Sequence, residues 1–185
     1  KIWVSVDGGL SWTQSNYPSP GASSSSYRVL VFWDRYSGNW YIMRHHLAAS
    51  GEVLIFRSIN NGTSWTYQGT IVATSSGSNA VMASSPDGTL WLLRVTGSTG
   101  TLRSSSNFGA TWTTVATSNH IRSVVEHDGE ILVAGYKTGP LPYLAVRQSG
   151  SWTEIPVSGP PGSAAPLAFT RYLVTVGPLL VAVMA

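Results

Sequence analysis

An eight-residue segment ending in tryptophan recurs along this chain of 185 residues, and it constrains the fold more than any other feature of the sequence. One copy runs from Ser5 to Trp12, the next from Ser58 to Trp65 and the third from Ser105 to Trp112. A shorter fourth copy ends at Trp152. Repeats about 40 to 55 residues apart are typical of propellers and solenoids.

The residue types in each copy predict a tight turn between two strands. Serine, aspartate and asparagine oxygens accept hydrogen bonds from turn NH groups, and the central glycine adopts a positive φ at little cost. The tryptophan is expected to begin the next strand and to pack between neighbouring sheets. The predicted turn positions are Ser5, Asp7, Gly9 and Trp12, Ser58, Asn60, Gly62 and Trp65, Ser105, Asn107, Gly109 and Trp112, and Gly150 and Trp152.

A second repeated feature is a strand, a short glycine-containing turn and another strand. These hairpins centre on Gly38, Gly88 and Gly129, and more loosely on Gly177. Such a pattern is a strong local hairpin signal. The interval from each hairpin glycine to the next repeat glycine is 24, 21 and 21 residues. The repeating unit is therefore predicted to contain four strands.

The pattern Ser-x-Asp-x-Gly-x-Ser/Thr-Trp resembles the Asp-box, or bacterial neuraminidase repeat, of sialidase-like β-propellers. The resemblance implies an all-β fold, a β-propeller of four-stranded antiparallel blades in which each box joins the third and fourth strands. It also implies that the boxes are structural turns that face away from the usual ligand surface. Only the first copy keeps the acid, because Asn60 and Asn107 stand at the equivalent positions.

The repeats predict one domain of about four blade-equivalents. A half blade covers residues 1–16, blades cover about 27–70, 78–117 and 121–157, and a second half blade covers 165–185. Pairing the two halves would close a four-bladed ring and remove an exposed sheet edge. The other interpretation is a piece of a larger propeller, and the repeat count leaves both open.

Composition excludes several classes of protein. The net charge of +3 comes from 11 basic and 8 acidic residues without a run of either sign, so we expect no nucleic-acid partner. The most apolar stretch, 172–185, is shorter than a bilayer span and contains Gly177-Pro178, so no membrane span is expected. There is no cysteine, only 10% of the residues are charged, and serine, threonine and glycine are abundant. This composition resembles that of extracellular and virion-associated adhesive proteins.

The acids and bases are too sparse to predict a catalytic site. The resemblance to sialidases would require an arginine triad, a tyrosine activated by a glutamate, and an acid. Arg44 and Arg94 hold the same place in successive hairpins and are predicted to face a ligand, but no Tyr-Glu pair accompanies them. The histidines lack metal-ligand spacing. We therefore predict no catalytic residue, no metal and no cofactor.

A binding or structural role remains. Trp40, Trp91 and Tyr136 lie in hairpin strands beyond the repeats and are predicted ligand-stacking residues. The sequence therefore predicts a non-catalytic propeller module, extracellular or virion-associated, that binds a glycan or a protein surface and can join an oligomer or larger assembly. The alternatives are a sialidase-like glycoside hydrolase and an assembly-factor propeller that binds a protein partner.

Overall fold

The structure is a computed structural model that describes residues 2–16, 27–46, 52–71, 78–136, 142–156, 170–176 and 179–184. For Tyr27, His46, Ser78, Tyr136, Pro142, residues 170–176 and residues 179–184 the description covers the backbone alone. Throughout these ranges the regular secondary structure is β-strand. The predicted all-β fold is confirmed. The described ranges hold no helix of the length and hydrophobicity that crossing a bilayer requires.

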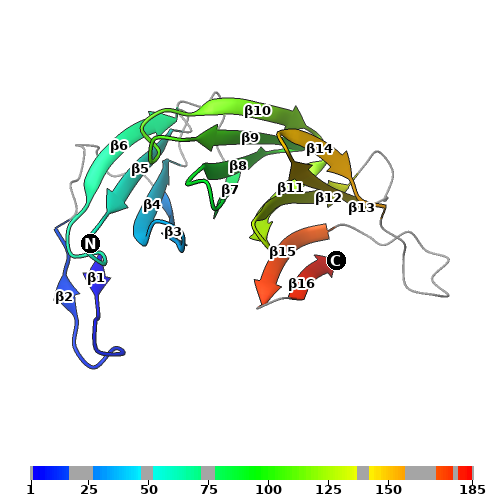
Figure 1. Cartoon of the computed structure of the whole chain (residues 1–185). Coiled ribbons are helices and arrows are strands. Elements are labelled where there is room, and N and C mark those ends of the chain that lie inside the picture. The colour runs from blue at the N-terminus through cyan, green and yellow to red at the C-terminus, as the bar shows by residue number, and fades with distance from the viewer. Residues whose placement is uncertain are drawn as a thin grey trace. The chain divides into compact units, whose positions relative to one another are not determined.

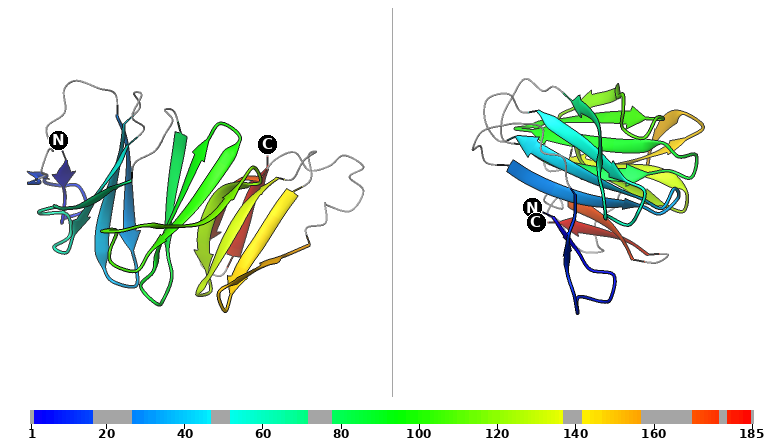
Figure 2. Two further views of the ribbon diagram at one scale, coloured as in Figure 1. Left: turned by 90° about the horizontal axis from the view of Figure 1, so that it is seen from above. Right: turned by 90° about the vertical axis from the view of Figure 1, so that its left-hand side faces the viewer.

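Three antiparallel sheets contain four strands each, and in each the strands are hydrogen-bonded in chain order (Figure 1). The first sheet consists of β3 (Tyr27–Asp34), β4 (Asn39–His46), β5 (Val53–Ser58) and β6 (Thr66–Ile71). The second consists of β7 (Ser78–Ser84), β8 (Leu90–Thr96), β9 (Thr99–Ser105) and β10 (Thr113–Ser118). The third consists of β11 (Ile121–His127), β12 (Glu130–Tyr136), β13 (Pro142–Gln148) and β14 (Ser151–Glu154). The views in Figure 2 show the strands of each sheet side by side.

Two further sheets contain two strands each. One pairs β1 (Trp3–Val4) with β2 (Thr13–Gln14), and the other pairs β15 (Thr170–Val176) with β16 (Leu179–Met184). The first pair is hydrogen-bonded to the turn that follows β5. Asn16 N donates to Thr63 O at 3.2 Å, and Trp65 N donates to Asn16 O at 3.2 Å. β1 and β2 thereby become part of the same body as the first sheet.

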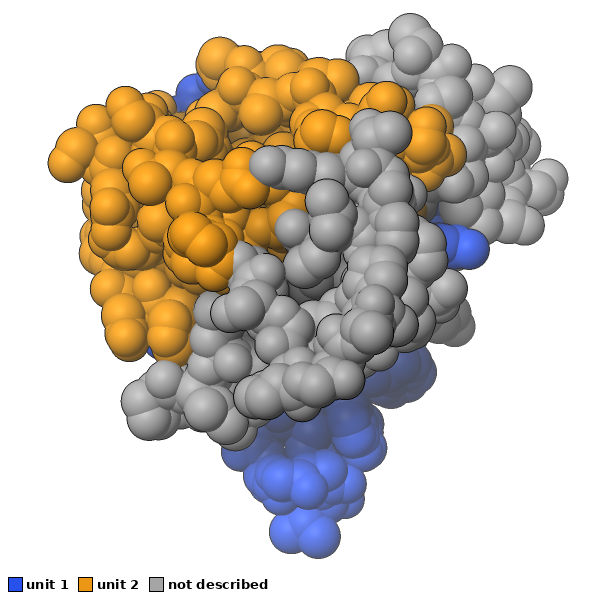
Figure 3. Space-filling model, turned by 90° about the vertical axis from the view of Figure 1, so that its right-hand side faces the viewer, with its two compact units in different colours: residues 1–77, 107–111 blue, residues 78–106, 112–185 orange. Residues whose placement is uncertain are grey.

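The chain divides into two compact units, which Figure 3 distinguishes by colour. Unit 1 comprises residues 1–77 and 107–111, and unit 2 comprises residues 78–106 and 112–185. Unit 1 thus holds the sheets β1–β2 and β3–β6, together with the turn between β9 and β10. Unit 2 holds the sheets β7–β10, β11–β14 and β15–β16.

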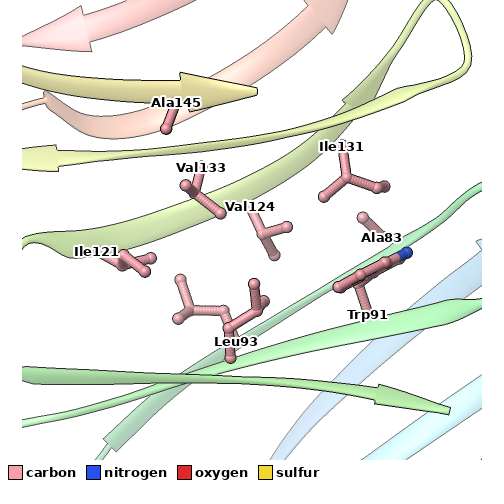
Figure 4. Packing of buried hydrophobic residues seen from close by; sticks show 9 residues of the cluster. Ala83, Trp91, Leu93, Ile121, Val124, Ile131, Val133 and Ala145 are labelled. Carbon is pink, nitrogen blue, oxygen red and sulfur yellow. The ribbon is translucent and has the colours of Figure 1, made fainter. Parts of the chain in front are cut away.

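The core of unit 2 lies between two sheets packed face to face. Ala83, Trp91 and Leu93 of β7 and β8 meet Val124 and other apolar residues of β11, β12 and β13 (Figure 4). Strand β15 packs in turn against β11 and β12. Stacking of successive sheets removes one apolar face of each from water, which is the main source of stability for such a unit.

The repeated turns share one backbone feature. Two successive residues have positive φ in each: Gly8 and Gly9, Asn61 and Gly62, Phe108 and Gly109, and Ser149 and Gly150. Glycine at the second place is explained by this φ, which penalises a β-carbon. At Gly62, an added β-carbon would also lie only 3.0 Å from Val4 Cγ2.

The side chain at the third position of the repeat organises each turn. Asp7 Oδ1 accepts from Ser11 N at 2.9 Å, and Asn60 Oδ1 accepts from Ser64 N at 2.9 Å. In the first turn Ser11 Oγ donates to Asp7 Oδ2 at 2.6 Å, whereas Asn60 Nδ2 donates to Ser64 Oγ at 2.9 Å. Asparagine therefore preserves the turn by reversing one hydrogen bond.

The third turn repeats the pattern seen at Asn60. Asn107 Oδ1 accepts from Thr111 N at 2.9 Å, and Asn107 Nδ2 donates to Thr111 Oγ1 at 2.8 Å. Ser105, Gly109 and Gly150 occupy the predicted turn places in their copies. The first three turns thus use a short side chain with an oxygen acceptor at this position, and a negative charge is not required.

The expectation that every repeat tryptophan packs between sheets is wrong at one position. Trp65 is buried in a cluster with Ile42 and Phe56, and Trp112 and Trp152 are half-buried. Trp12, in contrast, is 59% exposed, with its Nε1 donating to Gly9 O at 3.1 Å. Trp12 directly precedes β2, whose described sheet has only two strands and offers little surface to cover an indole.

Candidate interaction surface on the first sheet

Strand β3 presents an apolar stripe to solvent along one side. Val29 is 58% exposed, Val31 54% and Trp33 52%. These residues alternate along the strand and so share one face of the sheet. We call them the β3 stripe. A row of large exposed apolar side chains in register marks an interaction site more strongly than scattered single residues do.

A cavity of about 480 Å³ adjoins the stripe within unit 1. Val31 belongs to both the stripe and the cavity wall. The rest of the wall comes from the segment around β1, from β4 and from the second repeated turn: Ile2, Trp3, Val4, Ser5, Val6, Trp40, Ile42, Asn61, Gly62 and Trp65. Three indoles and several aliphatic chains make this wall predominantly apolar, which suits contact with another apolar surface.

The third sheet shows what normally covers this face. Val31 pairs with Ile42 across β3 and β4, and at the corresponding place in β11 and β12, Val124 pairs with Val133. Yet Val124 is only 2% exposed, because Ala83, Trp91 and Leu93 of the preceding sheet pack over this face (Figure 4). The β3 stripe is exposed instead, and the described residues of unit 1 include no pair of strands placed over it as β7 and β8 are placed over Val124.

The cavity wall is mostly apolar and carries no charge. Ser5 and Asn61 are its polar residues, and none of its lining residues carries an ionisable side chain. Across the part of the chain that the structure describes, no group of three or more histidine, aspartate or glutamate side chains is placed to hold a metal ion. General acid–base chemistry needs titratable groups at the substrate, and the described lining of this cavity supplies none.

Trp40 is the predicted ligand residue that the structure brings to this surface. It is half-buried, lines the cavity and lies 6.2 Å from Trp33 between ring centroids. Sequence reasoning missed Val29 and Val31, although the alternating apolar residues of β3 are visible in the sequence.

Trp91 has a different environment from the one predicted. It is 2% exposed, its Nε1 donates to Ser85 Oγ at 3.0 Å, and its ring meets the edge of Trp152 at 6.4 Å. The Arg147 guanidinium lies over the same ring, 4.8 Å from its centroid. With both its surface and its N–H occupied, Trp91 packs the core, which argues against the predicted stacking role.

The predicted arginine pair is divided between the units. Arg44 is half-buried in unit 1, and Arg94 is 5% exposed in unit 2. Burial, and to a lesser degree the charge of Arg103, lower the pKa of Arg94. A common ligand for Arg44 and Arg94 stays a prediction, as does a ligand role for Tyr136, whose side chain lies outside the described residues.

Arg57 in unit 1 is held by an aromatic ring and a polar side chain. Arg57 lies over the Phe108 ring, 3.9 Å from its centroid. The Asn39 side-chain oxygen, in the amide orientation that satisfies its neighbours, accepts from Arg57 Nε at 3.2 Å and Nη2 at 3.0 Å. Nearby Tyr41 is fully buried, and burial raises its pKa. This cluster holds the turn that carries Phe108 against the first sheet.

Consecutive four-stranded antiparallel sheets joined in chain order define the class of this protein as an all-β, β-propeller fold. Among solved structures it resembles a protein of unknown function from Dyadobacter fermentans DSM 18053, with a TM-score of 0.56 and 18% identity over 84% of this chain and 51% of the other. It also resembles the NanB sialidase from Streptococcus pneumoniae, with a TM-score of 0.55 and 18% identity over 78% of this chain and 25% of the other. A third similar structure is the Hadza microbial sialidase Hz136, with a TM-score of 0.53 and 16% identity over 81% of this chain and 35% of the other.

At these identities the likeness shows the fold alone, and the fold is that of the sialidase propellers. The chain spans between 25% and 51% of the length of these structures. No protein-family model and no curated protein matches the sequence.

Proposed function

We propose that this chain is a non-catalytic binding and structural module of the sialidase-like β-propeller type, and that it binds a protein partner through the β3 stripe and the adjoining cavity. The observation that carries the proposal is the uncovered apolar face of β3, set beside the covered equivalent face of β11. Burial of such a face gains about 25 cal/mol for each Å² of apolar surface removed from water.

The chemistry of the partner follows from the third sheet. There the equivalent face packs against the sheet β7–β10, to which the hairpin β7–β8 contributes Ala83, Trp91 and Leu93 and β9 contributes Leu102. A partner that presents an apolar β-hairpin therefore fits the surface better than a sugar, whose hydroxyl groups would find few polar partners on this wall. The repeated turns act as structural corners in this proposal, in keeping with the Asp-box resemblance.

The proposed location is outside the cytoplasm, on a cell surface or a virion. Its support is compositional: charged residues form only 10% of the chain, cysteine is absent, and serine, threonine and glycine are abundant. Fractionation of the native host or virus, with an antibody against this chain, tests the location. Recovery in the soluble cytoplasmic fraction alone would contradict it.

Binding is tested with a labelled peptide of residues 78–96, which spans the hairpin that covers the equivalent face in unit 2. Fluorescence anisotropy is expected to show saturable binding to the wild type. In Val31→Lys the Kd is expected to rise about tenfold or more, which corresponds to a loss of about 1.4 kcal/mol of binding free energy. Thr66→Lys is the control, because Thr66 is an exposed residue of β6 that pairs with Arg57 and so lies on the opposite face of the first sheet from Val31.

Two further assays address the rival functions. A fluorogenic sialoside and a panel of other glycosides are expected to show no turnover, and a glycan array is expected to show no specific binding. Sialoside turnover would favour the glycosidase alternative. A glycan hit that Trp40→Ala abolishes would make the cavity a sugar site. Failure of the peptide to bind would remove the protein-binding proposal.

A further inference from the structure

We infer that Asn61 is a site of N-linked glycosylation, and that the group it receives is an oligosaccharide carried by a lipid diphosphate. This inference rests on the proposed location outside the cytoplasm, because the pattern that such transfer requires is used in exported proteins. Asn61, Gly62 and Thr63 match that pattern, which is Asn-x-Thr with x other than proline. None of the other asparagines in the chain is followed two residues later by serine or threonine.

The structure places this pattern on the surface, at the turn between β5 and β6. Asn61 and Thr63 are exposed, whereas Gly62 between them is buried. Within the part of the chain that the structure describes, neither the Asn61 amide nor the Thr63 hydroxyl forms a hydrogen bond. The two side chains that a transferring enzyme must read are therefore both on the outside of the turn.

The neighbouring asparagine shows the contrast. Asn60 uses its whole amide inside the turn, because its Oδ1 accepts from Ser64 N at 2.9 Å and its Nδ2 donates to Ser64 Oγ at 2.9 Å. The residue two places after Asn60 is Gly62, which has no hydroxyl. Of these two adjacent asparagines, only Asn61 has both an available Nδ2 and the required threonine.

The turn itself requires neither an amide at position 61 nor a hydroxyl at position 63. The first of these places has positive φ in every copy and accepts unrelated side chains, namely Gly8, Phe108 and Ser149. The second place is occupied by Leu10 in the first turn and by Ala110 in the third. An asparagine and a threonine at the glycosylation spacing are thus explained by modification rather than by the needs of the backbone.

The chemistry is a substitution at a sugar carbon. A bond forms between Asn61 Nδ2 and the anomeric carbon of the first sugar, and the bond between that carbon and the diphosphate oxygen of the lipid carrier breaks. The diphosphate leaves with the electron pair, and Nδ2 loses one proton. The product keeps an uncharged amide and adds a bulky, polar group to the surface of unit 1.

Mass spectrometry of the chain isolated from its native source tests the inference. The expected result is that the peptide containing Asn61 carries an oligosaccharide, which a peptide N-glycosidase removes and thereby leaves aspartate at position 61. An unmodified Asn61 in chain recovered outside the cytoplasm would overturn the inference. That result would leave the proposed location and the binding of the peptide of residues 78–96 intact, so the two proposals fail separately.

Two substitutions of one residue assign the site. Thr63→Ala breaks the pattern and is expected to abolish the glycan, whereas Thr63→Ser keeps the pattern and is the matched control that still carries it. Circular dichroism and thermal unfolding of Thr63→Ala should match the unglycosylated wild type, because Ala110 stands at the same place in the third turn. A glycan that persists in Thr63→Ala would lie on another residue and would overturn the assignment to Asn61.

Discussion

Replacement of Trp91 by alanine is expected to destabilise unit 2 by about 3–5 kcal/mol, the range for removal of a buried tryptophan side chain. Trp91 is 2% exposed and packs with Ala83 and Leu93. The substitution also removes the hydrogen bond to Ser85 Oγ and the edge contact with Trp152, at 3.0 Å and 6.4 Å. A contribution of this size is a large part of the roughly 5–15 kcal/mol by which a domain is stable.

Urea unfolding followed by circular dichroism measures this change. For a chain of this length, the loss corresponds to a fall of about 6–20 °C in the unfolding temperature, at about 2–4 °C for each kcal/mol. Trp12→Ala is the matched control, because Trp12 has the same side chain at 59% exposure. It is expected to cost roughly 1 kcal/mol or less, mostly from the hydrogen bond to Gly9 O.

Trp91→Phe separates packing from hydrogen bonding. It keeps a ring in the core but removes the indole N–H, while Ser85 Oγ keeps its 2.6 Å bond to Asp87 Oδ1. About 1 kcal/mol is expected for this variant. A core-packing role for Trp91 would be contradicted if Trp91→Ala lowered the free energy of unfolding no more than Trp12→Ala does. It would also be contradicted if Trp91→Ala abolished binding of a ligand without lowering the free energy of unfolding.

Three other predictions follow from the turns and close contacts. Gly135→Ala is expected to lower the free energy of chemical unfolding by about 3 kcal/mol or more, because the added β-carbon would lie 1.6 Å from His120 O. The control is Gly88→Ala, whose β-carbon meets no atom within 4 Å. It should cost about 1–2 kcal/mol, because Gly88 has a φ of +80°. The hydrogen bonds from Ser11 and Ser5 lower the pKa of Asp7 to about 2 from 3.8, so its charge stabilises the first turn above pH 3.8, and this contribution should vanish as pH falls through about 2. The difference in unfolding temperature between wild type and Asp7→Asn, followed through that acid range, should show this loss, and a flat difference would contradict it. Arg57→Ala and Phe108→Leu should show a coupling free energy of about 0.5–1 kcal/mol in a double-mutant cycle of unfolding. Additive effects would contradict a stabilising cation–π contact between the two side chains.

The strand and turn pattern could be predicted from local signals. Glycines at Gly62 and Gly109 have the positive φ that the repeats predicted, and the hairpins around Gly38, Gly88 and Gly129 join paired strands. These features depend on backbone conformation and on hydrogen bonds within a few residues, so the amino-acid types along the chain carry enough information.

The candidate site could be predicted only in part. Trp40 was found from the sequence and lines the cavity, but Trp91 stands in a similar hairpin and is buried. Val31 and Val124 are both valines in the first strand of a sheet, yet their exposures are 54% and 2%. No local property of either valine distinguishes them, because exposure is set by whichever residues pack over them.

The amino-acid sequence by itself determined that this chain forms antiparallel four-stranded sheets with tryptophan-terminated corners, because turn chemistry and strand propensity act over a few neighbouring residues. The tertiary structure alone decided which apolar faces are covered and which stay open. A face is buried only when another sheet stacks on it, as β7 and β8 stack on β11, whereas the described strands of unit 1 leave Val29, Val31 and Trp33 of β3 exposed. The difference between a core and an interaction surface therefore lies in that stacking.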